Sequence, residues 1–192
     1  MSPSHFPSRS LLLLFGFALL LLFSGCSQCH RSTEEFPPWR FGSERADYEI
    51  VLPGEWRREP AGSINPHAEL ATSRDDSLFF LVIPQQLPSF PRPTTLELKE
   101  TALAHLETTV DDFAIDRQGS IELDGIRALS VFASGSLDER RLSYITTYLT
   151  HGDFGYQLVA FSEKEFEELL IREKDIILST WRFPSQRPDL LD

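Results

Sequence analysis

Cysteine is nearly absent from this chain of 192 residues, and its basic residues are too few to balance the acidic ones. The two cysteines, Cys26 and Cys29, stand close together, and the sequence after them has none. No disulfide framework or cysteine-based metal site can support that later part, so a hydrophobic core must stabilise it. The formal net charge is −11 without an offsetting basic stripe, which disfavours nucleic acid as a partner because phosphate backbones are also negative.

Long apolar runs are also missing, apart from the stretch of 13 residues from Leu11 to Phe23. At about 1.5 Å per residue this stretch is shorter than the ~30 Å hydrocarbon layer of a membrane. Arg9 precedes it, and the small pair Ser24-Gly25 follows it, which is the order of a secretory signal peptide. We therefore expect residues 1–25 to be a signal peptide, with an uncleaved anchor helix as the alternative.

Cys26 follows this stretch at the position of a lipid-attachment cysteine. The preceding Ser24-Gly25 is the usual small pair, although Phe23 stands where leucine is more typical. Acyl chains on Cys26 would hold the protein on a membrane, because each buried methylene contributes about 0.8 kcal/mol. The next residue is Ser27, whereas the usual inner-membrane retention signal has aspartate there. This difference favours the outer membrane, facing the periplasm.

The same residues allow a second interpretation. Cys26, Cys29 and His30 have the C-x-x-C-H spacing of c-type haem attachment. Haem would require both thiols, so it excludes lipid on Cys26, and it also requires an apolar pocket around the group. The motif stands ahead of a polar segment, and the only methionine is Met1, so the usual methionine ligand is missing. We therefore predict lipid at Cys26 and no cofactor, with haem c as the alternative.

The rest of the chain divides into a tether, one domain and a tail. Residues 26–45 are polar and include Pro37-Pro38, which indicates a lipidated tether. The domain is expected over residues 46–183, and residues 184–192, with two prolines, are expected to form a loose tail.

The domain shows the patterns of strands and of two helices. Thr94 with Glu97, and Ser162 with Glu165, each have capping-box spacing and predict the starts of the helices. The pair Asp124-Gly125 between apolar residues predicts a two-residue hairpin turn. The expected strands are 48–52, 68–73, 77–83, 126–133, 141–150 and 154–161, and the segment 121–126 contains the hairpin turn. Strands without regular alternation with helices indicate an antiparallel sheet that carries the helices, an α+β fold.

Four segments resemble motifs of PsbP-like domains. They are 48–56, with its Pro-x-x-Trp turn, 123–128, 154–159, and 166–183. The ending Ser179-Thr180-Trp181-Arg182-Phe183 departs from the shorter Ser-Phe ending usual in the family. The resemblance implies an α/β/α sandwich around an antiparallel sheet of about six strands. It also implies no shared catalytic centre, because members of the family bind or help assemble other proteins.

No residue set in the sequence combines a nucleophile, a base and an oxyanion hole. Asp153 belongs to an Asp-Phe-Gly triplet after His151, but no other kinase motif accompanies it, and a turn is the simpler interpretation. His67 and His105 are too far apart in the sequence for a typical metal-ligand pair. Together these observations predict a non-catalytic lipoprotein of the bacterial envelope, without a metal. Its expected partners are the membrane, through the lipid, and an unidentified envelope protein.

Overall fold

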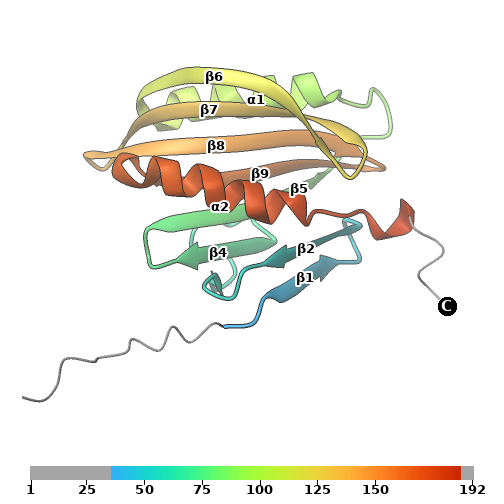
Figure 1. The fold of residues 1–192 in the computed structure, drawn as a ribbon. Helices are drawn as coiled ribbons and strands as arrows, with labels where there is room; N and C mark the ends of the chain where they lie inside the picture. The colour runs from blue at the N-terminus through green and yellow to red at the C-terminus, as the bar shows by residue number, and fades with distance from the viewer. Residues whose placement is uncertain (1–35, 187–192) are drawn as a thin grey trace, which may run out of the picture. The chain divides into compact units, whose positions relative to one another are not determined.

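The computed structural model describes residues 36–186 of the chain. The predicted signal peptide, Cys26, Cys29 and His30 lie outside the described residues. Figure 1 shows one sheet with a helix on each face: α2 (Glu167–Ser179) covers one face, and α1 (Thr95–Thr109) lies on the other. The predicted α/β/α arrangement is therefore confirmed.

The main sheet has seven antiparallel strands in the order β3-β4-β5-β9-β8-β7-β6, where the resemblance implied about six. The strands are β3 (Arg57–Arg58), β4 (Leu70–Arg74), β5 (Leu78–Gln86), β6 (Asp111–Leu123), β7 (Ile126–Leu137), β8 (Arg140–His151) and β9 (Phe154–Glu163). Four of them, β6 to β9, follow one another as hairpins. On the other side of β9, β3 pairs with β4 and β4 with β5, and β5 pairs with β9 across α1 and these hairpins.

The predicted strand at 48–52 lies outside this sheet. It is β2 (Tyr48–Leu52), and it pairs with β1 (Trp39–Ser43) in a separate two-stranded sheet. Regular structure thus begins ahead of residue 46. At the other end, the 3₁₀ turn η2 (Pro184–Gln186) follows α2, and the Ser185 amide donates a 3.1 Å hydrogen bond to Asp47.

The two helices begin differently. α1 has the predicted capping box, in which the Glu97 amide donates to the Thr94 hydroxyl and the Glu97 carboxylate accepts from the Thr94 amide. The second predicted capping box is wrong, because β9 continues through Ser162 to Glu163. The short 3₁₀ turn η1 (Lys164–Phe166) then leads into α2, which has no side-chain cap.

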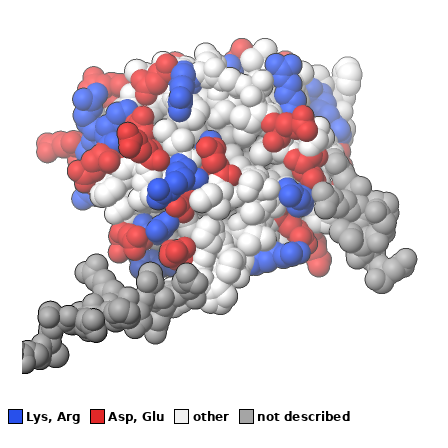
Figure 2. All heavy atoms as spheres, viewed as in Figure 1, with Lys and Arg blue, Asp and Glu red and all other residues white. Residues whose placement is uncertain are grey.

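The two faces of the sheet have separate hydrophobic clusters. The larger cluster lies under α2 and includes the stacked rings of Tyr48 and Trp181, whose centroids are 4.8 Å apart. The smaller cluster lies under α1 and includes Leu103 and Tyr148. Figure 2 shows acidic and basic side chains intermixed on the face that carries α2.

Neither helix of the described part is long and apolar enough to cross a membrane.

Candidate functional site

A groove runs along α1 on the side that faces β8, β9 and β5. We call it the α1 groove, and its cavity volume is about 490 Å³. One wall is the helix, with Ala102, His105 and Leu106. Part of its rim is formed by Ile64 and Asn65, from the segment between β3 and β4. The volume is within the range of about 300–1,000 Å³ that is typical of ligand pockets.

The floor of the α1 groove follows from the alternation of side chains along the strands. Successive strand residues point to opposite faces, so every second residue of a strand faces α1. The floor residues are Leu81 and Ile83 of β5, Tyr144, Thr146 and Tyr148 of β8, and Gln157, Val159 and Phe161 of β9. At one end, Phe79 and Phe161 stack with their ring centroids 4.8 Å apart. The groove therefore has a mainly apolar floor with a few neutral polar groups.

Charge is missing from the α1 groove. None of the described residues that line it is an aspartate, glutamate, lysine or arginine, although 24% of the residues in the chain are charged. The hydroxyl groups in the floor stay neutral at ordinary pH. Burial raises the pKa of Tyr148 to about 12, against a smaller opposing effect of the Thr146 hydroxyl, and burial also raises the pKa of Tyr144. Apart from the His105 imidazole in its wall, the groove thus presents apolar, hydroxyl and amide groups to a ligand.

A second hollow of about 370 Å³ adjoins the α1 groove and shares Gln85, Leu98 and Thr101 with it. It is more polar, because Arg92 and Glu97 also line it. The Arg92 guanidinium donates a 2.5 Å hydrogen bond to Asp153. The mainly apolar α1 groove therefore continues into a neighbouring hollow that has charged side chains of both signs.

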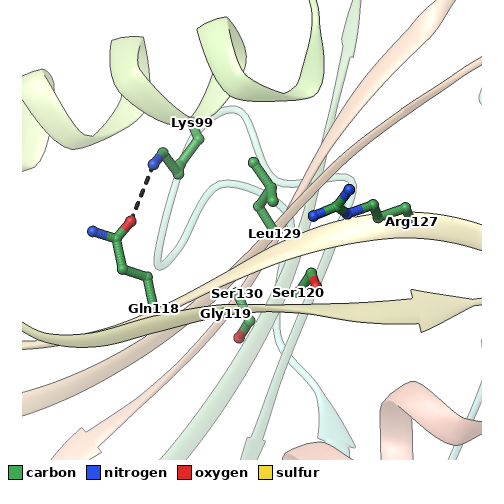
Figure 3. Close-up of a pocket in the computed structure, with 7 residues that line it drawn as sticks. All are labelled: Lys99, Gln118, Gly119, Ser120, Arg127, Leu129 and Ser130. Atoms are coloured by element: carbon green, nitrogen blue, oxygen red, sulfur yellow. Dashed lines mark hydrogen bonds between the residues drawn. The ribbon is translucent and has the colours of Figure 1, made fainter.

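Another hollow lies on the opposite side of α1, next to β6 and β7, with a volume of about 320 Å³. Figure 3 shows Lys99 of α1 and Gln118 of β6 pointing toward one another, and the lysine donates a 3.1 Å hydrogen bond to the glutamine carbonyl oxygen. Arg127 lines the other end of this hollow, beyond Leu129, and among the described residues neither Lys99 nor Arg127 forms an ion pair. This small hollow next to β6 is therefore basic, in contrast to the protein as a whole.

Strand β6 is an open edge of the main sheet. It pairs with β7 on one side, and the described residues place no strand on the other. Its first half is irregular, with register shifts before Arg117, but residues 118–123 pair regularly with β7. Irregular pairing disfavours the addition of another strand, so the regular stretch is the part of the edge that another strand could join.

The turn after β6 determines which of its backbone groups face outward. Asp124 and Gly125 form the predicted two-residue turn, and both have positive φ, +47° and +79°. In such a turn the flanking pair, Leu123 and Ile126, exchanges both backbone hydrogen bonds. Because hydrogen-bonded and non-hydrogen-bonded pairs alternate, the N–H and C=O groups of residues 118, 120 and 122 point away from β7.

The other residues considered from sequence do not assemble into a site. Asp153 lies in the turn between β8 and β9, as predicted, and the rest of its triplet begins β9; the His151 ring lies 4.2 Å from the Phe183 ring. His67 is exposed, and His105 lies at the α1 groove. The described residues contain no group of three or more His, Cys, Asp or Glu side chains able to hold a metal ion.

Sequence analysis missed the α1 groove and the edge at β6. Tyr144 and Tyr148 occupy alternate positions of one strand, which indicates a shared face but not which part of that face the helix covers. The start of β6 shows no alternation of apolar and polar residues, because it is exposed on both faces. Only the Asp124-Gly125 turn pointed to this strand.

The helices and strands form an antiparallel α/β/α sandwich with a PsbP-like fold. This sandwich has a groove under α1 and a long open edge at β6. Comparison with solved structures supports this assignment. The cyanobacterial PsbP (CyanoP) of Synechocystis matches with a TM-score of 0.60 at 10% identity, over 81% of this chain and 97% of that chain. LpqN of Mycobacterium tuberculosis, described as involved in cell envelope biogenesis, matches with a TM-score of 0.55 at 14% identity, over 75% and 90%.

The Ran-binding protein Mog1p of Saccharomyces cerevisiae also matches, with a TM-score of 0.50 at 8% identity, over 76% of this chain and 95% of that chain. At these identities the likeness shows a shared fold. No family model matches the sequence, and no curated protein matches it either.

Proposed function

We propose that this protein is a non-catalytic lipoprotein of the bacterial envelope that binds another envelope protein. The position of Cys26 after an apolar stretch and Ser24-Gly25 supports the lipid anchor. The fold supports a binding role, because similar folds occur in a protein of cell envelope biogenesis and in a Ran-binding protein. Ser27 after the cysteine favours the outer membrane, facing the periplasm.

The open edge of β6 is the observation that carries the binding role. A partner segment in extended conformation could add to residues 118–123 as a further strand and pair with the outward-facing backbone groups of residues 118, 120 and 122. Lys99 and Arg127 lie beside this stretch and make no ion pair within the described part. A partner segment with an acidic side chain on the α1 face would therefore complement this edge.

A proline at Ser120 tests strand addition. Proline removes the outward N–H of residue 120 without removing a hydrogen bond to β7, whereas Ser120→Ala keeps that N–H. With a photo-crosslinking residue at Glu122 of the full chain in intact envelopes, we expect one discrete protein adduct. It should be retained in Ser120→Ala and reduced at least tenfold in Ser120→Pro.

An adduct that survives Ser120→Pro, or the absence of any adduct, contradicts binding through β6. An adduct with the mass of two copies of this chain shows that the edge pairs with itself instead of with another protein.

The lipid anchor is tested by the pair Cys26→Ala and Cys29→Ala. We expect Cys26→Ala to leave the membrane fraction and remain folded, because the acyl chains have lost their attachment atom. Cys29→Ala should stay with the membrane. Fractionation of envelopes, with mass spectrometry of the processed amino terminus, measures both outcomes. Membrane association of Cys26→Ala contradicts anchoring at this residue.

Haem attachment is the second candidate function, and the Cys26, Cys29 and His30 spacing favours it. It makes the opposite prediction for Cys29, because both thiols form thioether bonds to the porphyrin. A pyridine-haemochrome band in the wild-type protein that is lost in Cys29→Ala would replace the lipoprotein proposal by a tethered cytochrome.

A further inference from the structure

The α1 groove is a site separate from the edge of β6, and its lining restricts what can bind there. Its described lining combines apolar side chains from α1, β5, β7, β8 and β9 with hydroxyl and amide groups and the His105 imidazole, and it includes no Asp, Glu, Lys or Arg. On a protein of net charge −11, such a stretch matches an uncharged ligand. The ligand part in the groove must therefore be apolar and neutral.

A hydrocarbon chain fits this groove better than a peptide segment does. The floor lies on the face of the sheet, where the backbone groups of β5, β8 and β9 are already paired in the ladder. A peptide there would lose water from its own N–H and C=O groups, with only a few side chains such as Gln85, Thr146 and Gln157 to replace it. A hydrocarbon chain has no such groups to satisfy.

The neighbouring hollow indicates where the polar part of the ligand lies. It shares three lining residues with the α1 groove and adds the guanidinium of Arg92, which pairs with Asp153, and the carboxylate of Glu97, which accepts from the Thr94 amide. Charges of both signs complement a zwitterionic headgroup and do not favour an anionic one. We propose that the α1 groove binds one acyl chain of a zwitterionic lipid, whose headgroup lies in the hollow beside Arg92.

Isothermal titration with lysophosphatidylethanolamines of 10, 12 and 14 carbons, below their micellar concentrations, tests this proposal. The protein is the full chain carrying Cys26→Ser, so that no attached acyl chain can occupy the groove. Affinity should increase about fourfold per added methylene, since each contributes about 0.8 kcal/mol when buried. The fatty acid of the same length should bind more weakly, because its carboxylate meets an acidic protein.

Two phenylalanine substitutions on α1 locate the site. Ala102 is half-buried and lines the groove, whereas Ala104 is exposed on the same helix and does not line it. Ala102→Phe should fill the groove and lower the affinity for the 12-carbon lipid at least tenfold, while Ala104→Phe should leave it unchanged. Circular dichroism checks that both variants fold, and the chain-length series on the parent protein tests the proposal without them.

Several results would overturn the proposal. The affinity could be independent of chain length, or Ala102→Phe and Ala104→Phe could bind the 12-carbon lipid equally well. An uncharged apolar peptide could also bind more tightly than the lipid. Self-association of the chain that Ala102→Phe abolishes would assign the groove to a second copy of the protein. The lipid-binding test is independent of the crosslinking test, because the β6 edge and the α1 groove lie on different sides of α1. If Ser120→Pro does not affect crosslinking, the result of the lipid titration still stands.

Discussion

At the scale of residues, the four tyrosines carry much of the packing on both faces of the sheet. Tyr48 and Tyr156 lie in the cluster under α2, where the Tyr156 hydroxyl donates a hydrogen bond to the Ala46 carbonyl. Tyr144 and Tyr148 lie under α1. Burial raises the pKa of all four hydroxyls, because it disfavours the charged phenolate. Folding therefore depends on these groups staying neutral.

Replacing Tyr148 by phenylalanine should make the protein less sensitive to alkaline pH. The folded-state pKa of Tyr148, about 12, is above the ordinary value of 10.0, so its contribution is complete below pH 10 and is lost as the pH rises toward 12. Between pH 9 and pH 11, the free energy of unfolding should fall by about 1 kcal/mol less in Tyr148→Phe than in the parent. Urea unfolding at both pH values measures this, and between pH 7 and pH 9 the difference between the proteins should stay constant.

At the scale of elements, the two helices show when a local capping signal is sufficient to predict where a helix begins. The capping box at Thr94 was predicted correctly because a proline-containing segment precedes it and no strand competes for these residues. Ser162 has the same spacing to Glu165, yet it continues β9, where Leu142 and Ser143 of β8 pair with Glu163 and Ser162. The pairing with β8 takes precedence over the local capping signal.

Removing the cap of α1 should destabilise the protein. Thr94→Ala deletes the hydroxyl that accepts from the Glu97 amide, and the loss of such a cap costs about 1 kcal/mol. Chemical denaturation measures the change. Thr108→Ala, in the last turn of the same helix, is the control and should change stability by less than half as much. Equal effects of both substitutions would show that the capping box does not stabilise α1.

At the scale of the whole molecule, the sequence allowed the class of fold and most of the element order to be predicted, but not the strand order. Local patterns identified the hairpins from β6 to β9, since their partners are neighbours in the sequence. The pairing of β5 with β9 and the separate sheet of β1 and β2 depend on contacts between distant segments. The α1 groove was not predictable for the same reason, because α1, four strands and the segment between β3 and β4 form it.

Trp181 shows how such distant contacts hold the domain together. It is fully buried, stacks on Tyr48 of β2 and lies edge-on to Tyr156 of β9 and to Phe183. Trp181→Ala should lower the free energy of unfolding by about 3–5 kcal/mol because it leaves a large cavity. Trp181→Phe, which keeps one ring, should lower it by less than half of that. Thermal and urea unfolding measure both, and a loss of less than 1 kcal/mol in Trp181→Ala would contradict this role.

The separation of the two hydrophobic clusters has a consequence for how such a protein can change over time. The large cluster under α2 secures the sheet, and the ring of Trp181 belongs to it, so substitutions there threaten folding itself. The smaller cluster under α1 borders the groove and consists of residues that do not belong to the larger cluster. Stability thus depends more on the side of the sheet under α2, and we expect substitutions that line the α1 groove to be tolerated better than substitutions around Trp181.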